Sequence, residues 1–195
     1  MTRRTRPIVR AAAGTGLAGA LYAELAAYEG RGSLHVLEQL RDERPASAAV
    51  LRAALRLVRE CAGAEGKRDS CAAEGASWLL LAWTQSEKGA RWTFKLVDEL
   101  LAAVPGCSGA SVRLHLIRCL GLVPHAAEQA LGAQELLCDG LEADRPFERA
   151  WCLDGLVRLA EQHPACAPVA RLALAKGASD PAASVRARVR NLTIL

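Results

Sequence analysis

Apolar residues recur along the chain at the three- and four-residue steps of an α-helix, in segments separated by turn residues. Leu17, Leu21, Leu25 and Tyr28 begin the pattern, and residues with this spacing lie on one face of a helix. The same period predicts helices over residues 17–28, 34–40, 46–62, 70–85, 90–104, 109–123, 126–143, 147–162, 166–178 and 181–195. No segment alternates apolar and polar residues as a half-buried strand does. The pattern therefore predicts an all-α protein with short turns.

Proline, glycine and small polar residues mark the ends of these segments. Pro45, Pro105, Pro124 and Pro146 each lie between two helical patterns, because proline cannot continue a helix from within but fits its first turn. Small polar side chains with an oxygen are the usual N-caps. We expect Ser33 to cap the helix after it, and Asp69 or Ser70 to cap the helix that runs to Gln85.

The composition indicates a core of aliphatic side chains and free thiols. Hydrophobic residues make up 51% of the 195 residues and aromatic residues only 4%. A chain of this length buries enough surface to fold without a disulfide or a metal. The seven cysteines are an odd number scattered through apolar segments, which is not the pattern of a disulfide framework. We therefore expect buried free cysteines and a cytoplasmic location.

The N-terminal residues differ from the rest of the chain. Residues 1–16 combine arginines with glycines, so we predict a flexible basic segment there and a single helical domain over residues 17–195. A processed targeting peptide is the alternative, because Ala18-Gly19-Ala20 has the small residues of a cleavage site. The uncharged stretch between Arg10 and Glu24 is too short to cross a bilayer. No membrane span is expected.

Three arginines at nearly equal intervals indicate an internal repeat. Arg113, Arg149 and Arg186 each lie near the start of an Ala/Leu-rich helical segment, and the steps between them are 36 and 37 residues (113 to 149 and 149 to 186). A recurring unit of this length, built only from helices, is typical of an α-solenoid of stacked helical hairpins.

The C-terminal copy of this unit carries a family resemblance. The run Asp180-Pro181-x-x-Ser184-Val185-Arg186 resembles the inter-helix turn and second helix of a HEAT repeat. Weaker copies start at Ser108 and Arg145. The resemblance covers residues 88–195, and from there back to about residue 46 only the helical rhythm continues. The resemblance implies a HEAT-like superhelix with an extended binding surface. It also suggests that each arginine reaches an acidic group in the preceding turn and so ties neighbouring repeats together.

Candidate residues for metal binding or catalysis are few. His115 and Cys119 have the i, i+4 spacing of two ligands on one helix, with Cys107 and His125 nearby. However, the chain contains neither a CxxC pair nor an HExxH motif. We interpret Cys119 as a core residue and His115 as a surface residue. We predict no cofactor, no metal site and no catalytic residue, and the protein is not expected to be an enzyme.

The sequence leaves two kinds of partner open. The first interpretation is a scaffold or adaptor domain that binds another protein, because a solenoid offers an extended concave surface. The alternative is a DNA- or RNA-binding HEAT-like protein, since the net charge is +4. The candidate partner or phosphate contacts are Arg171, Lys176, Arg186, Arg188 and Arg190.

A narrower form of the nucleic-acid alternative is also open. Some alkylpurine DNA glycosylases are built from HEAT-like repeats. Trp151 and Asp154, three residues apart on one predicted helix, resemble an aromatic-plus-carboxylate pair of such an enzyme. We expect a continuous positive strip with an inward tryptophan for a nucleic-acid partner, and a surface of mixed charge for a protein partner.

Overall fold

The computed structural model describes residues 16–30, 33–61, 66–86 and 90–192, and these residues are all-helical with turns between. The predicted basic segment lies outside the described residues except for Gly16. The helices are α1 (Leu17–Leu25), α2 (Leu34–Glu43), α3 (Ala48–Cys61), α4 (Lys67–Gln85), α5 (Phe94–Ala103), α6 (Ala110–Leu122), α7 (Ala127–Gly140), α8 (Pro146–Gln162), α9 (Ala167–Gly177) and α10 (Ala183–Arg190), with a short 3₁₀ turn at Pro164–Cys166.

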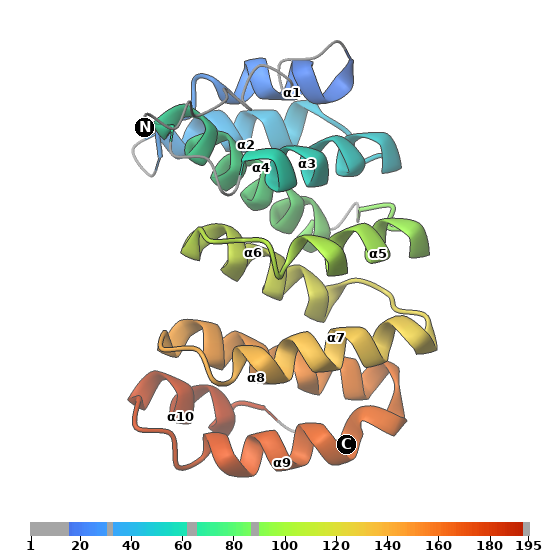
Figure 1. Cartoon of the computed structure of the whole chain (residues 1–195), viewed down its shortest axis with the longest axis vertical. Helices are drawn as coiled ribbons and strands as arrows, with labels where there is room; N and C mark the ends of the chain where they lie inside the picture. The colour runs from blue at the N-terminus through green and yellow to red at the C-terminus, as the bar shows by residue number, and fades with distance from the viewer. Residues whose placement is uncertain (1–15, 31–32, 62–65, 87–89, 193–195) are drawn as a thin grey trace, which may run out of the picture.

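The helices form two layers that run along the long axis of the molecule (Figure 1). The odd-numbered helices α1, α3, α5 and α7 contact one another in order, and the even-numbered helices α2, α4, α6, α8 and α10 do the same. Each odd helix also packs against the even helix that follows it. In the described residues the chain is thus a stack of helical hairpins, and the prediction of an all-α solenoid-like fold is confirmed.

The core is a continuous aliphatic cluster between the two layers. Its members are mostly leucines, alanines and valines, and Leu116, Leu137 and Leu156 at the centre of the stack are at most 1% exposed. Alanine and glycine let the even helices approach closely. A Cβ atom at Gly121 of α6 would lie 3.0 Å from the Cα atom of Gly155 of α8, so both positions favour the smallest residue.

Two of the three repeated arginines, Arg113 and Arg149, link successive hairpins. Arg149 donates hydrogen bonds to both carboxylate oxygens of Asp180, at 2.8 and 2.9 Å, and the Nε atom of Arg113 donates to Glu148. Other guanidinium nitrogens of both arginines donate to carbonyl oxygens of residues before their own helix. Arg186 makes only this second kind of contact, with the carbonyl oxygens of Asp180 and Pro181.

The prediction that each arginine binds an acidic side chain of the preceding turn was therefore wrong. The preceding turn supplies carbonyl oxygens, whereas the carboxylate comes from the next hairpin. Glu148 lies in the first turn of α8 and Asp180 just before α10, where the helix dipole favours a negative charge. The five N–H donors of a guanidinium point in different directions and can serve both sides.

Two predicted N-caps also differ from the structure. Ser33 precedes α2 but makes no capping bond; its hydroxyl accepts from the backbone N–H of Glu29 at 2.7 Å instead. The helix α4 begins at Lys67, so Asp69 and Ser70 lie inside it. The Asp69 carboxylate is buried and accepts a 2.7 Å hydrogen bond from the hydroxyl of Tyr22 on α1. A hydrogen bond between α1 and α4, which are far apart in the sequence, thus takes the place of the predicted N-cap.

Candidate functional site

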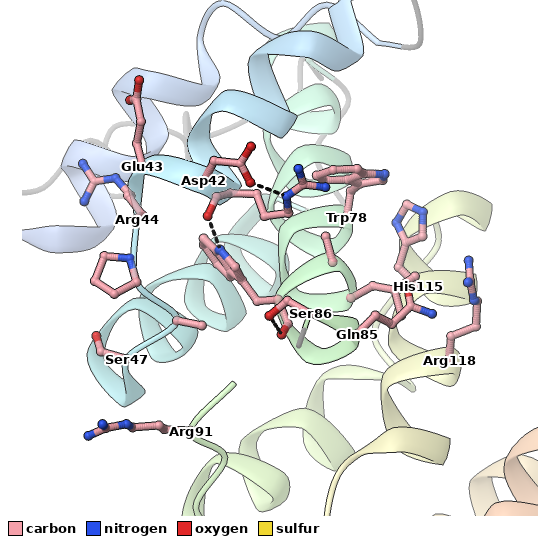
Figure 2. A pocket seen from close by; sticks show the side chains of 16 residues that line it. Asp42, Glu43, Arg44, Ser47, Trp78, Gln85, Ser86, Arg91, His115 and Arg118 are labelled. Carbon is pink, nitrogen blue, oxygen red and sulfur yellow. Dashed lines mark hydrogen bonds and ion pairs between the residues drawn. The ribbon is translucent and has the colours of Figure 1, made fainter. Parts of the chain in front are cut away.

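An open groove of about 1030 Å³ lies over the even-numbered helices, and Figure 2 shows it from close by. The end of α2 and its turn into α3 form one wall, α4 forms the floor, and α6 forms the other wall. The lining residues are Arg41, Asp42, Glu43, Arg44, Pro45, Ala46, Ser47, Trp78, Leu81, Ala82, Trp83, Gln85, Ser86, Arg91, His115 and Arg118.

Three of these residues occupy equivalent places in successive repeats. Arg41 on α2, Trp78 on α4 and His115 on α6 are separated by steps of 37 residues (41 to 78 and 78 to 115). Because one step corresponds to one hairpin, these side chains project from the same face of neighbouring even helices. All three are half-buried. The repeat therefore continues into the first half of the chain, where the inter-helix turns are not followed by a Val-Arg pair as they are at Val112-Arg113 and Val185-Arg186.

Tryptophans give the groove an apolar surface. Trp78 is half-buried and its ring lies between the α2 and α6 walls in Figure 2. Trp83 is only 2% exposed, and its indole N–H donates to the carbonyl oxygen of Arg41 at 3.3 Å. Trp83 thereby fixes the end of α2 against α4, while Trp78 keeps ring surface for a ligand. Aromatic side chains of this kind contribute most of the energy at many binding surfaces.

Both signs of charge line the groove. Arg41 pairs with Asp42 at 2.8 Å, and Arg44 pairs with Glu24 of α1. Among the described residues no carboxylate lies within ion-pair distance of Arg91 or Arg118. The groove thus combines paired charges at the α2 wall with unpaired cations opposite.

His115 adds no charge to this groove near neutral pH. The hydroxyl of Ser77 donates its only proton to the carbonyl oxygen of Glu74 at 2.8 Å. The Nδ1 atom of His115, 2.9 Å from the same hydroxyl oxygen, is therefore assigned as the donor. Burial, and then the nearby charge of Arg118, lower the pKa of His115 to about 4. His115 was predicted at the surface, but the structure shows it half-buried and neutral.

Beyond Arg118 the surface continues into a stack of arginine and tryptophan, which we call the Trp151 stack. The guanidinium carbon of Arg118 on α6 lies 4.2 Å from the ring centroid of Trp151, and that of Arg188 on α10 lies 4.1 Å from it. Because α6 and α10 flank α8 on opposite sides, the two guanidinium groups cover opposite faces of the indole. Asp154, which is 7% exposed, accepts from Arg158 at 2.8 Å and lies 3.5 Å from Arg188.

The five predicted contact residues have different surroundings. Arg188 belongs to the Trp151 stack, and Arg186 is bound to the turn before α10. Lys176 at the end of α9 pairs with Glu142 on the surface. Arg171 on α9 and Arg190 on α10 are exposed. Arg188 is the one of the five whose contact with Trp151 places it next to the groove.

Sequence reasoning missed Arg118 and Arg158 in this surface. One signal was present: Trp151 and Arg188 are 37 residues apart (151 to 188), which is one repeat, so their side chains were bound to be neighbours on α8 and α10. Trp151 and Asp154 do lie together, as the glycosylase-like interpretation requires. However, both ring faces of Trp151 carry a guanidinium group and Asp154 is ion-paired, so a base would have to displace an arginine to stack there.

The residues with metal-ligand spacing have other partners. Cys119 is 0% exposed, as predicted for a core residue, and burial raises the pKa of its thiol to about 12. The Nε2 atom of His125 lies 2.7 Å from the carbonyl oxygen of Leu120. The thiol of Cys107 donates to the carbonyl oxygen of Ala103. In the part of the chain that the structure describes, no three His, Cys, Asp or Glu side chains form a metal-binding group.

Comparison of the chain with models of known protein families, with curated proteins and with solved structures found no match. None of the helices in the described ranges is both long enough and apolar enough to cross a membrane. What the chain binds must therefore be argued from its surface alone.

Proposed function

We propose that this chain is a non-catalytic binding module that holds an extended segment of a protein partner in the groove over α2, α4 and α6. The groove's mixed lining carries the proposal: the half-buried ring of Trp78 lies between the Arg41–Asp42 pair on one side and Arg118 on the other. Protein interfaces typically combine an aromatic or arginine anchor with a polar rim of both charges.

The charges favour a protein over a nucleic acid at this groove. Asp42 and Glu43 lie on the wall that is formed by the end of α2, where a phosphate backbone would meet negative charge. Nucleic-acid sites usually present a continuous basic strip. Together with the HEAT-like resemblance, this supports a scaffold or adaptor role. The proposal keeps the non-catalytic role and the cytoplasmic location that the sequence led us to expect.

The test is a selection from a random dodecapeptide library displayed on phage, with the whole chain as bait. Fluorescence anisotropy then gives the affinity of each enriched peptide. We expect Trp78→Ala to weaken binding by about 30-fold, the loss that follows removal of a hot-spot residue of about 2 kcal/mol. Leu172→Ala is the control, because Leu172 is 74% exposed on α9 in the other layer.

Two results would contradict the proposal. The first is a selection that enriches no peptide at all. The second is a set of enriched peptides whose affinity is unchanged in Trp78→Ala, since such peptides would bind elsewhere. Circular dichroism of the variant confirms that any loss of binding is not a loss of fold.

A second candidate function, nucleic-acid binding, is favoured by one observation. The Trp151 stack brings Arg118, Arg158 and Arg188 near a single carboxylate, Asp154. Titration of a fluorescent DNA duplex at 50 and 200 mM salt tests it, because phosphate contacts make the affinity fall steeply with salt. A steep fall, reduced in Arg188→Gln, would support a nucleic-acid partner, and an alkylated duplex in the same assay would then test base excision.

A further inference from the structure

The Trp151 stack contains more positive charge than its surroundings neutralise. Arg118, Arg158 and Arg188 share one carboxylate, Asp154, which is bonded to Arg158 at 2.8 Å and lies 3.5 Å from Arg188. His115 beside Arg118 is neutral at physiological pH because its pKa is about 4. An anionic ligand would therefore lower the energy of this surface.

Arg118 is the least compensated of these cations. Its Nε atom is buried and has no hydrogen-bond partner among the described residues, and its contact is with the face of Trp151. Burial, and then the positive charge of Arg188, lower its pKa. A desolvated guanidinium that faces a second one gains more from a carboxylate than an exposed arginine does.

The geometry of the stack sets the spacing of its ligand. Each guanidinium carbon lies about 4 Å from the Trp151 centroid on its own side, so the two carbons are about twice that distance apart. One carboxylate cannot bond to both groups in a bidentate manner. In an extended peptide, however, residues i and i+2 are on the same side and about 7 Å apart, and their side chains can reach one guanidinium each.

We propose that Arg118 and Arg188 bind two carboxylates at positions i and i+2 of an extended acidic segment, which continues past Arg118 into the groove at Trp78. The inference rests on the proposed function and names the chemistry of the partner. Arg118 connects the two parts, because it lines the groove and also covers Trp151. The ring holds both guanidinium planes in place, so that little side-chain freedom is lost when the acids bind.

A protein segment fits this surface better than a phosphate backbone. Both faces of the Trp151 ring are occupied by guanidinium groups, so no base can stack on it as they are placed. Asp154 lies 3.5 Å from Arg188, and Asp42 lies on the α2 wall of the groove. Evenly spaced phosphates would carry negative charge along the whole surface as far as Asp42, whereas paired acids with apolar or neutral neighbours carry it only at Arg118 and Arg188.

The experiment uses the dodecapeptides from the phage selection, together with synthetic versions in which the acidic residues are replaced by the matching amides. The peptides should be enriched in Asp or Glu at i and i+2. At 50 mM NaCl the amide versions should bind at least tenfold more weakly, and at 500 mM NaCl the difference should shrink. Arg118→Gln and Arg188→Gln should each weaken the acidic peptides about tenfold and weaken the amide versions much less.

The matched control is Arg190→Gln, which removes the same charge from an exposed position on α10, the helix of Arg188. It should leave the affinity for the acidic peptides within twofold of the wild type. Arg118→Lys and Arg188→Lys keep the charge without the planar guanidinium, so an intermediate loss is expected. Circular dichroism of every variant shows whether the fold is kept.

The outcomes separate the inference from the proposed function. Enriched peptides that need Trp78 but lack paired acids, or that bind equally to Arg118→Gln and Arg188→Gln, overturn the inference and leave the groove as a peptide site. A selection without enrichment overturns both. An oligothymidylate of ten nucleotides that binds through the same two arginines, when no acidic peptide does, overturns the inference in favour of nucleic acid.

Discussion

Replacing Arg149 by alanine should loosen the contact between the last two hairpins. Arg149 on α8 donates two hydrogen bonds to Asp180 and two more to the carbonyl oxygens of Ala143 and Asp144. The side chains of Arg149 and Asp180 are only 15% and 12% exposed. The variant therefore leaves a half-desolvated carboxylate with the backbone N–H of Ala182 as its remaining donor.

The size of the effect follows from this burial. Breaking a fully buried ion pair costs about 3–5 kcal/mol and a surface pair less than about 1 kcal/mol. A pair that is mostly covered, with bidentate geometry, should lie between these limits, at about 2–3 kcal/mol. For a chain of this length, 1 kcal/mol corresponds to roughly 2–4 °C in Tm, so Arg149→Ala should melt roughly 4–12 °C below the wild type.

The assay is thermal unfolding followed by circular dichroism, with Arg145→Ala as the matched control. The Arg145→Ala substitution removes the same charge from an exposed site just before α8. It should change the free energy of unfolding by less than about 0.5 kcal/mol. The pH dependence gives a second readout. Hydrogen bonding from Arg149 lowers the pKa of Asp180, so the stabilisation is complete above the ordinary carboxylate pKa and is lost as the pH falls through the lowered one.

The difference between the wild type and Arg149→Ala should therefore be largest at neutral pH and should shrink in strong acid. The reasoning fails if Arg149→Ala and Arg145→Ala melt at the same temperature. It also fails if the difference grows as the pH falls, because protonation of Asp180 would then strengthen the contact rather than remove it.

Two further predictions concern packing and protonation. A Cβ atom at Gly140 would overlap Sγ of Cys152, whereas one at Gly132 on the same helix would meet nothing within 4 Å. In urea unfolding, Gly140→Ala should therefore lower the free energy of unfolding by about 1–3 kcal/mol, and Gly132→Ala should leave it unchanged or raise it slightly. Equal effects of the two substitutions would contradict the packing. Because the pKa of His115 is lowered to about 4, the unfolded chain takes up this proton first, so wild-type stability should fall by up to about 3 kcal/mol between pH 6.5 and 4. His115→Asn, with an amide that can still donate to Ser77, should reduce that slope, while His125, whose pKa burial also lowers, keeps its own contribution. Unfolding at a series of pH values measures the slope, and an unchanged slope would refute the assignment.

The sequence alone determined the class of fold and its rhythm. Helical period, proline positions and the spacing of Arg113, Arg149 and Arg186 are local or repetitive signals, and they located the helices to within a few residues. The aliphatic core and the burial of Cys119 followed in the same way. These features depend on which residues lie on one face of one helix, and the order of residues along the chain fixes that.

Only the tertiary structure decided which side chains from different helices meet. In the folded chain the carboxylate of Asp69 accepts a hydrogen bond from Tyr22 instead of capping a helix. Arg149 forms an ion pair with Asp180 of the following hairpin. The tertiary structure also brought Arg118 of α6 over the ring of Trp151 on α8. Such contacts depend on the distance and relative rotation of neighbouring helices, which arise from packing across the whole stack and which no local pattern in the sequence specifies.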